Sequence, residues 1–378
     1  MSNNTTIGAK IKVIGVGGGG GNMVNHMITE GISGIDLLVA NTDAQALSTS
    51  KAPTKIQLGE RKTKGLGAGM KPEIGKDSAL ESFDNIKEAL EGADMVFIAS
   101  GFGGGTGTGA APIVAQAAKE VGALTISVVT KPFGFEGRKR SRLAEVGIGE
   151  LSKESDSIVI IPNDKLLSIV DKDLGVKESF KLVDDILSRA VGGMSAVVLS
   201  SGDNDINVDF ADVQTIMSHR GMAILGVGEA EGEDSAVEAV KNAIESPLLD
   251  NLSINGAMGV LVHFNLHPDF PLVQIQNAMD IIYDSADEDA DVIFGTTTDE
   301  KMSINQLKIT IVATGFAKEN NKNIPKDTAA NNPSTKPAEP IFRPNIENPN
   351  IGRAVSGGGY ILEDEDLDYP TFLRRQMD

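Results

Sequence analysis

Two glycine-rich segments are the residues in this sequence best suited to chemistry, because each lies between an apolar run and a helix-like segment. They are GVGGGGGN (15–22) and FGGGTGTG (102–109). Glycine carries no Cβ to hold a phosphate away from the backbone, and the N-terminus of a following helix favours an anion. In the second segment, Thr106 and Thr108 add hydroxyls that can donate to phosphate oxygens. Both segments therefore predict phosphate binding.

A third glycine cluster, GLGAGMKPEIG (65–75), is suited to close over a terminal phosphate. Two or three anion sites favour a nucleoside triphosphate over a dinucleotide, and no loop ends in the Gly-Lys-Ser/Thr of an ordinary P-loop enzyme. The rival interpretation is a Rossmann-type dinucleotide-binding oxidoreductase, because Gly15, Gly17 and Gly20 also satisfy its fingerprint. A Rossmann site expects an Asp or Glu near the end of the next strand to bind the ribose. Here that strand ends in Asn-Thr-Asp (41–43), so this criterion does not decide between the two interpretations.

Apolar runs that alternate with helix-like segments must position these loops. Such alternation predicts an α/β fold with a doubly wound, mainly parallel sheet and right-handed crossovers. Aromatic residues make up only 4% of the chain, which suits a sheet core of Val, Ile, Leu and Ala. The predicted strands are 11–16, 36–41, 94–100, 124–130 and 157–162, with helices that include 22–31, 78–92 and 110–122.

A long amphipathic helix is predicted over 178–194, because its apolar residues recur at helical spacing. Beyond it the pattern indicates a smaller α+β domain that this helix joins to the first. Its predicted strands are 222–230, 255–266, 290–298 and 306–316, and its helices are 234–246 and 270–284. We place the limits at 1–9 for a flexible N-terminus, 10–175 for the first domain, 176–200 for the central helix and 201–317 for the second domain.

Composition excludes several classes of function. The 378 residues include no cysteine, which rules out disulfides, thiolate catalysis, Cys-ligated zinc and iron–sulfur clusters. A formal net charge of −19 argues against nucleic acid as a partner, because nucleic-acid binding depends on clustered Lys and Arg. The sequence shows neither a signal peptide nor a run of about 20 apolar residues. We therefore expect a cytoplasmic protein without direct membrane insertion.

The C-terminal part has a different composition. Residues 318–365 begin with a stretch dominated by Asn, Pro, Lys and Thr, which cannot bury enough apolar area to offset the entropy of ordering. We expect a disordered linker there. Residues 366–378 carry Tyr369, Phe372 and Leu373 at the i, i+3, i+4 spacing of a docking helix. A frayed terminus is the alternative, but apolar side chains beyond a linker favour a partner-binding tail.

The segment GGGTGTG resembles the signature of the FtsZ family, the tubulin-like GTPases of bacterial cell division. Other segments that carry the resemblance are VGGGGGN, ANTDAQAL, GLGAG, TKPFGFEGRKR, IPNDKLL, NVDFADV, SPLL and YPTFLRRQ. The likeness runs from about residue 10 to 316 and resumes in the last ten residues. It implies a GTP-binding domain at 10–175, a GTPase-activating domain at 201–317, and a polymerising cytoskeletal protein that forms the division ring at mid-cell.

The resemblance also implies roles for individual residues in binding GTP or GDP. Asp184 would accept hydrogen bonds from the guanine ring NH and amine, Phe180 would stack on guanine, and Asn41 would face the ribose. Glu136 and Arg140 would contact the sugar and phosphates. From the residues alone, Phe180 is better explained by core packing, and Glu136 with Arg140 by a helical i,i+4 ion pair. The other residues assigned to the nucleotide are Gly18, Gly19, Gly20, Gly21, Asn22, Gly69, Gly105, Thr106, Gly107, Thr108 and Asn163.

The glycine loops hold no obvious carboxylate to position a hydrolytic water. The resemblance implies that Asp209 and Asp212 are the catalytic residues. On their own they are better explained as charges that complement a helix N-terminus. The resemblance implies instead that they act on the GTP of the next subunit in a head-to-tail protofilament. Mg²⁺ is expected to be held through phosphates and water, with no protein ligand. The resemblance implies that residues 366–378 bind membrane-adaptor and regulatory division proteins. A further alternative for the whole protein is a nucleotide-regulated scaffold with negligible catalysis.

Overall fold

A computed structural model describes residues 8–166, 175–199, 206, 208–218, 221–246, 254 and 256–316. Most of the predicted flexible N-terminus, the linker 318–365 and the tail 366–378 lie outside these residues, and the domain limits stay predictions. Within the described residues, no helix has the length and apolar character needed to cross a membrane.

The described strands form one sheet in the order β3-β2-β1-β4-β5-β6-β7-β10-β8-β9. From β3 to β6 every neighbouring pair is parallel, as the doubly wound pattern predicts. The predicted strands are confirmed, although β8 starts later than expected, and β3 was not predicted. The strands are β1 (Ile11–Val16), β2 (Asp36–Asn41), β3 (Thr54–Gln57), β4 (Met95–Gly101), β5 (Leu124–Lys131), β6 (Ser157–Pro162), β7 (Gly221–Glu231), β8 (Gly259–Leu266), β9 (Asp291–Thr298) and β10 (Gln306–Thr314).

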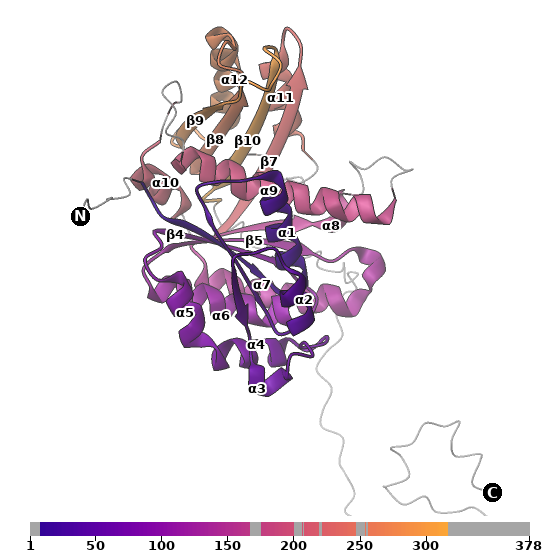
Figure 1. Ribbon diagram of the computed structural model, residues 1–378. Coiled ribbons are helices and arrows are strands. Elements are labelled where there is room, and N and C mark those ends of the chain that lie inside the picture. The colour runs from indigo at the N-terminus through magenta and orange to yellow at the C-terminus, as the bar shows by residue number, and fades with distance from the viewer. Residues whose placement is uncertain are drawn as a thin grey trace, which may run out of the picture. The chain divides into compact units, whose positions relative to one another are not determined.

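Helices cover both faces of the parallel part, because its strands are apolar on both sides (Figure 1). Val13 and Phe97 join the core under α1 and α9, whereas their neighbours Ile14 and Ile98 join the core on the opposite face. On the first face lie α1 (Gly17–Glu30), α2 (Ala44–Thr49) and α9 (Val176–Leu199); on the second lie α4 (Pro72–Glu81), α5 (Phe83–Leu90), α6 (Thr106–Glu120) and α7 (Arg138–Glu154).

The second half of the sheet is mixed. β10 pairs antiparallel with β7 and β8, and β8 pairs parallel with β9. One face packs against α11 (Ser235–Ile244) and α12 (Leu272–Ser285), and the other against α9 and α10 (Phe210–Met217). Helix α9 thus packs against both halves (Figure 1). A second link was not predicted: the first residues of β7 also pair with β6, at Ser157–Gly221 through Val159–Ala223.

Three predicted helices differ from the structure. The segment 78–92 is two helices, α4 and α5, which meet at Ser82. The Ser82 hydroxyl accepts a hydrogen bond from the Gly59 amide at 3.0 Å. Helices α1 and α6 begin at Gly17 and Thr106, inside the glycine runs and not after them. The glycine runs therefore form the first turns of helices, and their amide groups belong to the helix N-termini.

Candidate functional site

A cavity of about 480 Å³ opens at the carboxyl ends of β4 and β5, beside the first turns of α1 and α6. Its volume lies in the ordinary range for small-molecule sites. The position is the one at which open α/β sheets bind ligands, because the loops that follow parallel strands meet at this edge. The lining residues are Gly18, Gly19, Asn22, Gly69, Gly101, Phe102, Gly104, Gly105, Thr106, Gly107, Thr130, Pro132, Glu136, Arg140, Asn163, Val183, Asp184 and Leu187.

The first turn of α1 supplies backbone to the cavity. Gly17 has φ +75°, a conformation that side chains disfavour, and a Cβ there would lie 2.9 Å from the Gly107 amide nitrogen. The two glycine loops therefore touch. Gly18 faces open space, with nothing within 4 Å of an added Cβ. Gly20 has a different role: it does not line this cavity, and a Cβ added to it would meet the Ala99 carbonyl oxygen at 2.1 Å, so it serves the close packing of α1 on the sheet.

The loop before α6 is equally tight. A Cβ added at Gly105 would lie 2.2 Å from the Gly69 carbonyl oxygen, and a Cβ added at Gly107 would lie 2.4 Å from the Gly101 carbonyl oxygen. Neither α1 nor α6 has a side-chain cap, and neither has an acidic residue in its first turn. Two helix N-termini thus present unneutralised amide dipoles at one end of the cavity, which is a favourable environment for an anion.

The two threonines of this loop differ. Thr106 lines the cavity, and its hydroxyl oxygen lies 2.6 Å from that of Thr42. Thr108 does not line it: the side chain is buried, and its hydroxyl accepts a hydrogen bond from the Gly103 amide at 2.9 Å. The sequence predicted two hydroxyls for phosphate, whereas the structure uses that of Thr108 to hold the loop. The reason is that the Thr108 side chain points back toward the preceding loop.

Glu136 and Arg140 line the cavity together and form an ion pair. The helical explanation of that pair was wrong in its geometry, because Glu136 ends a 3₁₀ turn (Gly134–Glu136), and Gly137, with φ +100°, separates it from α7. Glu136 also accepts a hydrogen bond from the Phe133 amide at 3.0 Å. The carboxylate is therefore held in place, and it orients the Arg140 guanidinium.

The rest of the cavity lining includes side chains of α9 and α8 (Asn163–Leu166), and we call this the opposite end because α8 follows β6, two strands along the sheet from β4. Burial raises the pKa of Asp184 to about 6, although the charge of nearby His26 on α1 lowers it. The buried amide oxygen of Asn163 has no hydrogen-bond partner among the described residues. A buried polar atom without a partner is costly, so it favours a bound group that donates to it. This end can therefore accept hydrogen bonds from a ligand.

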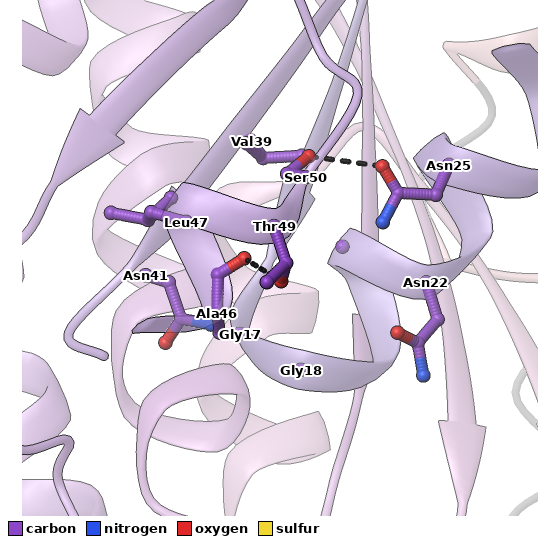
Figure 2. Close-up of a pocket in the computed structure, with 11 residues that line it drawn as sticks. Gly17, Gly18, Asn22, Asn25, Val39, Asn41, Ala46, Leu47, Thr49 and Ser50 are labelled. Atoms are coloured by element: carbon purple, nitrogen blue, oxygen red, sulfur yellow. Dashed lines mark hydrogen bonds between the residues drawn. The ribbon is translucent and has the colours of Figure 1, made fainter. Parts of the chain in front are cut away.

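A smaller cavity of about 80 Å³ adjoins the first, and Gly18 and Asn22 line both. It also takes in Gly21 and Asn41, which the sequence analysis assigned to the nucleotide. Figure 2 shows it between the first turns of α1 and helix α2. The Ser50 hydroxyl donates to the side-chain oxygen of Asn25 at 3.0 Å and fixes the wall behind it.

The candidate catalytic pair is not in either cavity. Asp209 directly precedes α10, Asp212 lies in its first turn, and both side chains are exposed. Within the described residues, Asp209 makes no capping hydrogen bond to the amide groups of α10. The structure thus brings most of the predicted binding residues together in the two cavities, with Gly20 and Thr108 outside them, and leaves the predicted acids apart.

Some site residues were missed by the sequence analysis. Val183 and Leu187 flank Asp184 on α9, and their apolar spacing indicates only a core-facing helix. Thr130, the penultimate residue of β5, and Pro132, which follows β5, also line the cavity, and their position at the carboxyl end of a predicted strand was the available signal. Phe102 and Gly104 line it too, and they lie in the glycine segment 102–109 that the sequence already indicated for phosphate binding. Phe180 lies on α9, but its side chain is outside the described residues. Among the described residues, no cluster of three or more His, Asp or Glu could hold a metal.

Comparisons with known proteins agree with this geometry. Residues 10–171 match the GTPase domain of the tubulin/FtsZ family, and residues 221–317 match the FtsZ family C-terminal domain. The chain is 46% identical over 374 residues to a cell division protein FtsZ of Helicobacter pylori, covering 98% of this chain and 93% of the relative. A solved "FtsZ dimer, empty" of M. jannaschii is 43% identical with a TM-score of 0.78, over 82% of this chain and 89% of that one.

A more distant solved structure shares the fold alone. It is CetZ2 of Haloferax volcanii, described as a GTPγS-bound protofilament, with 22% identity and a TM-score of 0.70 over 82% of this chain and 94% of that one. These matches leave the dinucleotide-binding oxidoreductase unsupported.

Proposed function

The chain belongs to the FtsZ family of tubulin-like GTPases that act in cell division, and on that premise we propose that it binds GTP and GDP in the cavity beside α1 and α6. The observation that carries this assignment is the contrast between the two ends of the cavity. One end has two uncapped helix N-termini for phosphates, and the other has the acceptors Asp184 and Asn163 for a base.

At the phosphate end, the amides of Gly18, Gly19, Gly21 and Gly105–Gly107 bind phosphate oxygens, and the Thr106 hydroxyl adds a side-chain donor. Arg140, oriented by Glu136, contacts the sugar and phosphate region. Because the described residues near the phosphates offer no set of carboxylates, Mg²⁺ is held through phosphates and water.

At the base end, the Asp184 carboxylate accepts hydrogen bonds from the guanine ring NH and amine. Adenine does not present these two donors together, so Asp184 selects guanine. The unpartnered oxygen of Asn163 accepts a further donor of the ligand, and Asn41 faces the ribose. Phe180 stacks on the base. This end therefore supplies specificity, and the phosphate end supplies most of the affinity.

Hydrolysis takes place between subunits of a head-to-tail protofilament. Asp209 and Asp212 are exposed and lie outside the cavity, which supports a role on the GTP of a neighbouring subunit. The two surfaces of such a contact differ, and a heterologous contact that does not close into a ring produces a filament. Turnover then depends on assembly.

A mixing experiment tests this assignment. Asp212→Ala is expected to bind GTP like the wild type but to lose about 99% of turnover, because the acid acts only on transition-state chemistry. Gly18→Ala is expected to fold but to bind nucleotide at least about 100-fold more weakly. When the two variants are mixed in equal amounts, the intact cavity of Asp212→Ala can meet the intact acidic segment of Gly18→Ala. Phosphate release should then exceed the sum of the separate rates.

Rates that stay additive at every mixing ratio would contradict the shared site. Asp269→Ala is a suitable control for the loss of an exposed acid, and it should leave turnover unchanged. Light scattering with GTP in the same samples separates the scaffold alternative, which predicts GTP-dependent assembly without phosphate release even in the wild type.

The cellular setting follows from the same family membership. We place the protein in the cytoplasm at the mid-cell division site, with residues 366–378 bound to membrane-adaptor and regulatory division proteins. Deletion of 366–378 is expected to leave GTPase activity within about twofold of the wild type and to abolish adaptor binding in a sedimentation assay. Retained binding would refute the role of the tail.

A further inference from the structure

Thr42 is a buried residue beside the phosphate end of the cavity that no step of the proposed mechanism uses. It follows β2 directly, is fully buried and lines neither cavity. Its hydroxyl oxygen lies 2.6 Å from the hydroxyl oxygen of Thr106, and either atom can be the donor. When Thr42 donates, the Thr106 proton is free to turn into the cavity.

The orientation of the Thr106 hydroxyl matters because it is the only hydroxyl of this loop that faces the cavity. The Thr108 hydroxyl is buried and accepts the Gly103 amide. Thr106 is also the first residue of α6, so its side chain stands at the point where the helix dipole is strongest. A hydroxyl fixed there donates to a phosphate oxygen without first having to give up rotational freedom.

The backbone of Thr42 joins a second loop to the same point. Its carbonyl oxygen accepts the Gln57 side-chain amide and the Gly67 backbone amide, each at 3.2 Å. Two residues further along this loop, the Gly69 carbonyl oxygen lies so close to Gly105 that a Cβ there would approach it to 2.2 Å. Thr42 therefore contacts the phosphate loop through its side chain and the loop that carries Gly69 through its main chain.

We propose that Thr42 is a positioning residue, whose hydroxyl orients the Thr106 hydroxyl toward the nucleotide phosphates. Thr42 touches no ligand and acts through Thr106. This inference rests on the proposed binding of GTP in the cavity, so its test must separate the two.

The test is a double-mutant cycle on the affinity for GTP and GDP, measured by calorimetry on the full chain. Thr42→Val keeps the shape of the side chain and removes its hydroxyl, and it is expected to weaken binding about tenfold, the typical worth of one hydrogen bond to a charged ligand. Thr106→Val should weaken binding by at least as much. In the Thr106→Val background, the Thr42 substitution should add less than about twofold.

Two controls separate positioning from general damage to the fold. Thr42→Ser restores the hydroxyl and should bind within about threefold of the wild type. Thr125→Val removes another buried hydroxyl, which donates to the Ala123 carbonyl at 3.1 Å at the start of β5, and it should leave affinity unchanged. Thermal unfolding of each variant without nucleotide reports any loss of stability.

The outcomes are distinct. Wild type that does not bind guanine nucleotides overturns the proposed function. Wild type that binds, together with a Thr42→Val variant of equal affinity, overturns only the positioning role. A Thr42 effect that persists in full in the Thr106→Val background also overturns it, because Thr42 would then act independently of Thr106.

Discussion

The two ends of the cavity to which we assign the nucleotide are built from different parts of the polypeptide. The phosphate end is mostly backbone, with glycines that allow loops to approach within contact distance and helices whose first amides are uncapped. The base end consists of side chains on α9 and α8, chiefly Asp184 and Asn163. Backbone binds any phosphate chain, whereas side chains distinguish one base from another. The comparison indicates that affinity and specificity can be altered separately.

The largest effect is expected at the phosphate end, from Gly18→Ala. The added methyl has nothing within 4 Å in the free protein, so the fold should tolerate it, but it occupies space in the cavity that a phosphate needs. We expect affinity for both GTP and GDP to fall at least about 100-fold, or about 2.8 kcal/mol. Calorimetry measures the affinity, and thermal unfolding without nucleotide should change little.

Gly149→Ala is the matched control, because this glycine of α7 also has open space at its Cβ and lies outside both cavities. It should bind nucleotide normally. If Gly18→Ala bound GTP as well as this control does, the phosphates would not lie against α1, and the contrast between the two ends would collapse.

A smaller effect is expected at the base end, where the raised pKa of Asp184 makes recognition depend on pH. In the proposed binding mode, only the carboxylate form of Asp184 accepts both guanine donors. With a pKa of about 6, roughly nine-tenths of Asp184 is protonated at pH 5. Wild-type affinity for GDP should therefore fall about tenfold from pH 8 to pH 5 beyond the change in Asp184→Asn, whose amide oxygen does not titrate. Equal pH profiles for the two proteins would contradict this.

Asp184→Asn is also expected to change the stability of the nucleotide-free protein. Asp184 has an ordinary pKa of 3.8 when unfolded and about 6 when folded, so burial of its charge costs stability as the pH rises through this interval. Below pH 3.8 the cost is absent, and above pH 6 it is complete. At pH 8 the free energy of unfolding of Asp184→Asn should therefore exceed that of the wild type by about 1–2 kcal/mol, a value reduced for a half-buried group. The difference should shrink toward pH 4.

The sequence pattern predicted the phosphate end of the cavity more readily than the base end. Glycine runs between strands and helices have a direct structural meaning, so the phosphate end and the parallel strands were accessible from pattern alone. Asp184 and Phe180 lie on an amphipathic helix, where spacing indicates packing and not ligand contact, and only the family resemblance assigned them. The roles of Gly20 and Thr108 depend on backbone distances of a few ångströms, which no residue pattern encodes. The link between β6 and β7 was also hidden, because strand neighbours far apart in sequence leave no local signal.

That link has a consequence for how the chain is made. During synthesis β6 emerges and pairs with β5 well before β7 exists, and its sequence, Ser-Ile-Val-Ile-Ile-Pro, is almost entirely apolar. Until Gly221–Ala223 arrives and pairs with Ser157–Val159, the outer edge of β6 offers unpaired amide and carbonyl groups to any other strand. This edge of β6 therefore stays open to aggregation while the segment between β6 and β7 is being translated, and the first residues of β7 then pair with its first three residues.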